Sequence, residues 1–180
     1  MKRSGNGTSD AQGTVTIAPR EGSGAIFSPC DRYRYSLWRV WDTALPRLLV
    51  IGLNPSTADA THNDPTIRRC IGFAKSWGYG SVVVTNLFAL RSPYPKALRT
   101  ASDPVGPQTD MWIGRLASEA DLCLVAWGNG GTLSGRDRAV GLQLARSSCP
   151  LACFGLTKQG QPAHPLYLKK TLRPMIWVPC

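Results

Sequence analysis

Four apolar runs along the chain each end in a polar or glycine-rich turn. None of the runs alternates between apolar and polar residues, which is typical of strands that are buried on both faces of a sheet. The runs are Arg47–Gly52, Ser81–Asn86, Leu122–Trp127 and Leu151–Gly155. Another extended stretch near Tyr33–Trp41 comes before them, and a short apolar piece, Met175–Val178, closes the chain.

Between these runs, apolar positions recur at helical spacing. After the first run, Asp64 is placed to cap a helix that begins at Pro65, and Gly78 is placed to end it. Further helices are predicted from near Pro107 and over about Gly135–Arg146.

Strands that alternate with helices imply parallel strands joined by crossover helices. The sequence therefore predicts an α/β fold with three layers, α/β/α, around a central, mostly parallel sheet of about four strands. Residues 1–24 are rich in Gly, Ser and Thr and are predicted to form a flexible N-terminal tail. Residues 25–180 are predicted to form a single α/β domain.

Composition and charge narrow the choice of partner. The chain of 180 residues is 43% hydrophobic and carries a net charge of +10. This excess favours nucleic acid or a phosphate-bearing ligand, and a merely basic surface is the alternative. The cysteines form no C-x-x-C pair, and no apolar run is long enough to span a bilayer. We expect a cytoplasmic monomer with free core thiols, no membrane contact, no metal and no cofactor.

Ligands of open α/β sheets bind beyond the carboxyl ends of the strands. The residues just past the predicted strands are Asn54, Asn86, Asn129 and, after the last strand, Thr157 and His164. Amide and imidazole groups that converge on one edge can read the hydrogen-bonding edges of a planar ligand such as a nucleobase.

Several long blocks occur in a fixed order after about Tyr33. They are NPSTAD (54–59), DPTIRRC (64–70), TNLFAL (85–90), DPVGP (103–107), WGN (127–129) and GQPAHPLYL (160–168). This series resembles the bacterial family known as domain of unknown function 1643 (DUF1643). The family name itself implies no chemistry.

Three shorter blocks resemble mismatch-specific uracil-DNA glycosylases. Leu49–Pro55 is similar to their G-x-N-P block, and Val84–Asn86 is similar to the strand end whose Asn reads the uracil edge. His164–Pro165 is similar to the start of their H-P-S block, with Leu166 in place of the Ser. The resemblance implies a fold of the uracil-DNA glycosylase superfamily.

The same resemblance implies roles in cleavage of an N-glycosidic bond. Asn54 would position the water that attacks the sugar C1′, Asn86 would read the base, and His164 would support the departing base anion. Because an amide is a poor general base, the nearby carboxylates Asp59 and Asp64 are candidates for that role. A helix cap is the alternative role for Asp64.

Basic residues near the predicted site are candidates for phosphate contacts. Arg68 and Arg69 lie in the first turn of a predicted helix, where a cation opposes the helix dipole and a phosphate would compensate it. Lys158 and Lys169 flank His164 and can meet a nucleic-acid backbone. A solvated surface is the alternative for each of them.

The remaining substrate-binding candidates lie close to strand ends. Pro55 and Ser56 follow Asn54 in its block, and Asn129 lies in a glycine-rich turn. Phe88 follows a predicted strand and can stack on a base.

These observations leave three functional hypotheses. The first is a glycosylase-like protein that hydrolyses the N-glycosidic bond of a damaged or modified pyrimidine in DNA. The second is an enzyme, a hydrolase or transferase, that processes a nucleotide or modified base in the same pocket. The third is a non-catalytic nucleic-acid binder.

Overall fold

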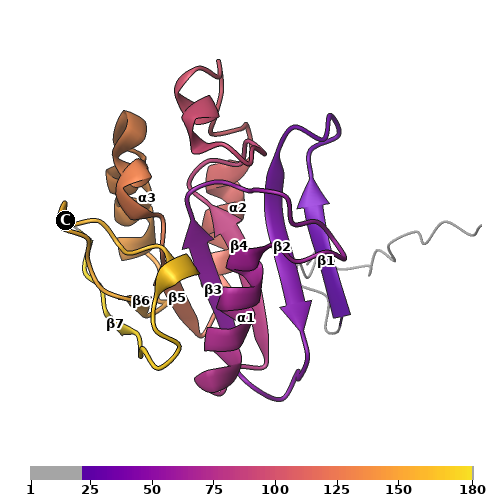
Figure 1. Ribbon diagram of the computed structural model, residues 1–180, viewed down its shortest axis with the longest axis vertical. Coiled ribbons are helices and arrows are strands. Elements are labelled where there is room, and N and C mark those ends of the chain that lie inside the picture. The colour runs from indigo at the N-terminus through magenta and orange to yellow at the C-terminus, as the bar shows by residue number, and fades with distance from the viewer. Residues whose placement is uncertain (1–21, 180) are drawn as a thin grey trace, which may run out of the picture.

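The computed structural model describes residues 22–179, which form a mixed sheet of seven strands with helices packed against it (Figure 1). The strands are β1 (Gly22–Phe27), β2 (Arg34–Val40), β3 (Arg47–Gly52), β4 (Ser81–Asn86), β5 (Leu122–Val125), β6 (Leu151–Cys153) and β7 (Met175–Ile176). The α-helices are α1 (Pro65–Ser76), α2 (Thr109–Ser118) and α3 (Arg136–Ala145). Short 3₁₀ helices are η1 (Pro95–Arg99), η2 (Gly128–Gly135) and η3 (Pro165–Tyr167).

The sheet order is β1-β2-β4-β3-β5-β6-β7. The four apolar runs form its centre, where β4, β3, β5 and β6 pair in parallel. Antiparallel strands extend this centre on both sides, β1 and β2 beyond β4 and β7 beyond β6. The α/β prediction is therefore confirmed, whereas the predicted number of about four strands is wrong, because the extended stretch at β2 and the apolar piece at β7 join the sheet as antiparallel strands and β1 was not foreseen.

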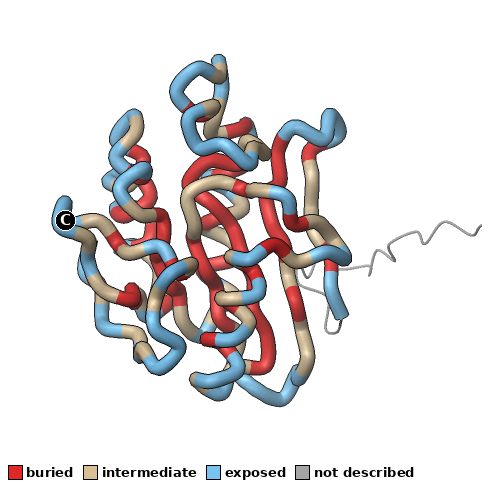
Figure 2. Tube along the Cα trace, in the orientation of Figure 1, coloured by how far each residue is buried: buried red, intermediate tan, exposed pale blue. Residues whose placement is uncertain are grey.

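The two faces of the sheet carry separate hydrophobic clusters, because successive side chains of a strand point to opposite faces. On β3, Leu49 and Ile51 pack in the cluster that includes residues of α2 and α3. Leu48 and Val50 pack in the cluster that includes residues of α1. Helix α1 thus covers one face and α2 with α3 the other (Figure 1), and the buried strands lie between them (Figure 2).

Helix α1 begins and ends as its sequence predicts. The Asp64 carboxylate accepts a hydrogen bond from the Ile67 N–H at 2.8 Å, and Pro65 takes the first helical position. At the other end, Gly78 has φ +83°, and the N–H groups of Gly78 and Tyr79 donate to carbonyls of the last turn. A left-handed residue at this position favours glycine. The cap fixes Asp64 at the carboxyl edge of the sheet.

Other predictions concern the tail, the thiols and the membrane. Residues 22–24 of the predicted tail belong to β1, and residues 1–21 lie outside the part that the structure describes. The predicted core thiols Cys123 and Cys153 are buried and free, and burial raises the pKa of both. Within residues 22–179, no helix is long and apolar enough to cross a membrane.

Candidate functional site

The order of the parallel strands creates a crevice at one place in the sheet. From β3 the chain crosses to β4 on one side, and the following parallel strand, β5, lies on the other side of β3. Loops that leave β3 and β5 therefore diverge, and such a switch point is where open α/β sheets bind ligands. A cavity of about 270 Å³ lies there, lined by residues that include Gly52 and Leu53 after β3 and Ala126 after β5.

This cavity brings together candidate residues from distant parts of the sequence. The loop after β3, the end of β4, the cap of α1 and the segment before η3 each contribute a polar side chain. The candidates that line the cavity are Asn54, Ser56, Asp64, Asn86 and His164.

Asn54 is held by its amide nitrogen. Its Nδ2 donates to the carbonyl oxygen of Pro55 at 3.0 Å and to that of Ser92 at 2.9 Å. The second bond ties the loop after β3 to the loop after β4. Neither bond uses the carboxamide oxygen of Asn54, which is available to accept a hydrogen bond from a water molecule or ligand.

Asn86 is buried in the cavity wall with one polar atom unsatisfied. The residue is only 5% exposed, and its Oδ1 has no hydrogen-bond partner among residues 22–179. A Cβ atom at Gly52 would lie 2.8 Å from Asn86 Nδ2, so the missing side chain of Gly52 makes room for this amide. A buried acceptor without a partner is costly, and a ligand donor would satisfy it.

Arg34 is a cavity residue that sequence reasoning missed. It is 3% exposed, its Nη1 donates to the Ala58 carbonyl at 2.7 Å, and its Nε has no partner in the described part of the chain. Burial lowers the pKa of Arg34 to about 10, against the opposing effect of the Asp64 carboxylate. The sequence feature that could have identified Arg34 is its charge at the start of a stretch predicted to be extended.

His164 and Asp64 supply the imidazole and the carboxylate of the cavity. The N–H of Leu166 donates to His164 Nδ1 at 3.3 Å, so the neutral imidazole carries its proton on Nε2. Partial desolvation lowers the pKa of His164, and the Asp64 carboxylate acts in the opposite direction. The imidazole is therefore a neutral donor near neutral pH. Asp64 is 8% exposed, and one of its oxygens caps α1.

Asp59, the other candidate carboxylate, does not line this cavity. Its Oδ1 accepts hydrogen bonds from the backbone N–H groups of His62 and Thr61. These bonds hold the pKa of Asp59 well below its usual range. The residue closes a local turn on the exposed side of the loop.

Phe88 and Asn129 also lie away from the cavity lining. The Phe88 side chain is fully buried in the core beside α2 and α3. Asn129 is exposed, and its Oδ1 accepts a hydrogen bond from Thr157 Oγ1 at 2.6 Å, which joins η2 to the loop after β6.

The basic candidates lie outside the cavity as well. Arg68 and Arg69 donate to backbone carbonyls, of Asn63 and Leu168 respectively, and Arg69 also stacks over the Phe73 ring at 4.7 Å. Lys158 and Lys169 are exposed. Pro55 is buried, and its carbonyl holds Asn54. Across residues 22–179, no group of three or more His, Cys, Asp or Glu is arranged to hold a metal ion.

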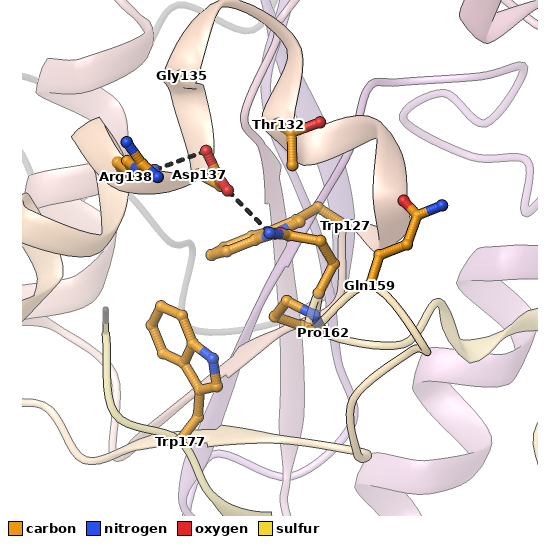
Figure 3. A pocket seen from close by; sticks show the side chains of 10 residues that line it. Trp127, Thr132, Gly135, Asp137, Arg138, Gln159, Pro162 and Trp177 are labelled. Atoms are coloured by element: carbon orange, nitrogen blue, oxygen red, sulfur yellow. Dashed lines mark hydrogen bonds between the residues drawn. The ribbon is translucent and has the colours of Figure 1, made fainter.

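A second cavity of about 510 Å³ lies beside α3 (Figure 3). Trp127, Asp137 and Trp177 line it together with Gln161. Polar side chains in it bond to one another: Trp127 Nε1 donates to Gln161 Oε1, and Gln161 Nε2 donates to Asp137 Oδ2, both at 2.9 Å. Two residues that line the smaller cavity, Arg34 and Asn86, each carry a buried polar atom without a partner among residues 22–179, so this cavity is the better candidate for a ligand site.

Comparison with models of protein families shows where the chain belongs. A family model described as "protein of unknown function (DUF1643)" matches residues 34–166, which is most of the chain. The chain therefore belongs to the DUF1643 family. No curated protein and no solved structure matched the chain.

Proposed function

We propose that the chain binds a nucleobase in the 270 Å³ cavity and hydrolyses the N-glycosidic bond of a damaged or modified pyrimidine in DNA. The observation that carries the proposal is that two residues lining the cavity each have a buried polar atom without a partner, Asn86 its Oδ1 and Arg34 its Nε. One atom requires a donor and the other an acceptor. A nucleobase presents both kinds of group on the edges of one rigid plane.

The size of the cavity supports a small ligand. Pockets for drug-sized ligands usually measure about 300–1,000 Å³. At about 270 Å³ the cavity suits a base with part of its sugar, and phosphates would remain outside. The location at a switch point between helix-covered faces also agrees with the three-layer, uracil-DNA glycosylase-like arrangement that the resemblance implies.

The cavity residues suit hydrolysis by an added water molecule. In the proposed reaction, the Asn54 oxygen holds the water and Asp64 accepts its proton as the water oxygen bonds to C1′. The bond between C1′ and the base nitrogen breaks, and its electron pair leaves with the base. The Nε2–H group of His164 donates to the base anion, which afterwards takes a proton from solvent.

The cavity favours Asp64 over Asp59 as the general base. Asp64 lines the cavity beside Asn54 and His164, whereas the Asp59 oxygen is used by a local turn outside it. Asp64→Asn keeps a good helix cap, because Asn and Asp are about equally favoured at that position. The substitution therefore separates the chemical role of Asp64 from its structural role.

An abasic-site assay on an oligonucleotide panel tests this proposal. The panel holds uracil, mismatched thymine, hydroxymethyluracil and hypoxanthine, in single and double strands. We expect base release by the wild type and a loss of roughly 10²–10⁴-fold in Asp64→Asn. Asp59→Asn is the matched control and should keep its activity. No base release from any substrate, or equal losses in both variants, would contradict the proposed reaction.

A further inference from the structure

The basic excess of the chain is concentrated in two segments. All 11 acidic residues lie within residues 10–64 and 103–137. Segments 65–102 and 138–180 contain lysine and arginine but no Asp or Glu. These segments supply η1 and η3, and residues in or just before those short helices line the 270 Å³ cavity: Pro93, Pro95, Pro165 and Leu166.

Each segment has an exposed tyrosine next in sequence to residues that line the cavity. Tyr94 is 73% exposed and Tyr167 is 94% exposed, values that are high for a large aromatic side chain. Tyr94 lies between two prolines that line the cavity, and Ser92 Oγ donates to its carbonyl at 3.0 Å and accepts its N–H at 3.1 Å. The backbone that carries Tyr94 is therefore held in place, because proline also fixes φ.

Exposed basic side chains accompany each tyrosine. Lys96 and Arg99 lie in η1 next to Tyr94, and Lys169 with Lys170 follows η3 next to Tyr167. None of these basic residues forms an ion pair within residues 22–179. Aromatic rings beside unpaired cations, in two segments that line the same cavity, match the composition of single-strand nucleic-acid sites.

We propose that Tyr94, Lys96, Arg99, Tyr167, Lys169 and Lys170 form a mouth surface that binds single-stranded nucleic acid. The tyrosines stack on the bases that flank the one in the cavity, and the lysines and Arg99 contact phosphates. This inference rests on the proposed function for the occupant of the cavity. The mouth surface nevertheless includes none of the residues that take part in the proposed reaction.

A single strand fits this surface better than a duplex. Exposed rings gain stacking energy only from unpaired bases, whereas duplex binding depends on phosphate contacts and groove edges. The cavity itself admits one base, which a single strand presents without the cost of unpairing. The mouth surface therefore favours single strands over duplexes, and it also supplies positive charge.

Fluorescence anisotropy with labelled oligothymidine, alone and annealed to oligoadenosine, tests the inference. We expect tighter binding to the single strand, and Tyr94→Ala and Tyr167→Ala should each raise its Kd by about 5- to 150-fold. Ile176→Ala is the control for loss of an exposed apolar side chain, since Ile176 is 84% exposed on β7. It should leave Kd unchanged.

A second pair of variants separates phosphate contact from overall charge. Lys169→Gln should lower the steepness of the salt dependence, whereas Lys75→Gln should not, because Lys75 lies over the Trp41 ring at the far end of α1. Equal or tighter duplex binding, or tyrosine variants that bind like the wild type, would overturn the inference. Oligothymidine binding without base release from any substrate would contradict only the proposed reaction.

Discussion

Replacing Asn86 with leucine should make the protein more stable and remove its ligand binding. Asn86 is 5% exposed, and its Oδ1 lacks a partner. An unsatisfied buried polar group costs about 1–3 kcal/mol, and leucine removes that group. The adjoining cavity of about 270 Å³ offers space for the larger side chain.

The expected gain can be converted into a melting temperature. A net stabilisation of about 1–2 kcal/mol raises Tm by roughly 2–8 °C for a chain of this length. Thr85→Val, at the neighbouring position of β4, should instead lower Tm. Thr85 is 1% exposed, and its hydroxyl donates to the Tyr35 carbonyl at 2.9 Å, so its loss costs about 1 kcal/mol.

Calorimetry and base binding should be measured on the same preparations. Ser36→Ala serves as the second control, because the Ser36 hydroxyl is also buried without a partner but does not line the cavity. It should keep ligand binding and lose no stability. A lower Tm for Asn86→Leu than for the wild type, or unchanged base binding by that variant, would refute the reasoning.

Other predictions follow from the same cavity. Gly52→Ala should weaken base binding, because its Cβ would lie 2.8 Å from Asn86 Nδ2, whereas Gly72→Ala meets nothing within 4 Å and should bind normally; calorimetric titration with a free nucleoside would show either outcome. Arg34→Lys should weaken binding more than Arg39→Lys in the same titration, since both side chains hold the loop after β3 but only Arg34 lines the cavity. Because partial desolvation lowers the folded-state pKa of His164 below its ordinary 6.5, the unfolded chain takes up the proton first as the pH falls. The free energy of unfolding should therefore fall as the pH is lowered from about 6.5 through the folded-state pKa. In urea unfolding, the midpoint should fall less with pH in His164→Ala than in the wild type. Equal dependence of the midpoint on pH in both proteins would contradict the assignment of this effect to His164.

The central strands and α1 were predictable because their signals are local. Unbroken apolar runs indicated strands buried on both faces, and the caps Asp64 and Gly78 marked the ends of α1. The edge strand β1 was missed because its glycines suggested a flexible tail. A Cβ at Gly24 would lie 2.2 Å from the Trp38 ring, so this glycine permits close packing of β1 on β2.

The strand-end rule located most of the candidate site. Of the residues predicted to converge, Asn54, Asn86 and His164 line the cavity, whereas Asn129 and Thr157 do not. The rule could not rank Asp59 against Asp64, because the difference depends on which local N–H groups each carboxylate meets.

The remaining errors come from contacts between segments far apart in sequence. Phe88 enters the core because the backbone beyond β4 stays paired, with the Phe88 N–H donating to the Leu53 carbonyl at 3.0 Å. Arg34 was missed because two structural facts make it a candidate: its Nε has no partner among residues 22–179, and it lines a cavity whose other walls come from distant segments. The sequence around Phe88 gives no signal of its burial, and the sequence around Arg34 shows only a charge in a stretch predicted to be extended.

The most direct test of the account is an NMR titration of the protein with free nucleobases and nucleosides, followed through backbone and side-chain N–H resonances. The account predicts shifts at Gly52, Asn86 and Ala126, around the 270 Å³ cavity, with none at the Trp127 indole or the Gln161 amide of the larger cavity. Shifts confined to Trp127 and Gln161, or no shifts with any base, would contradict the assignment of the site.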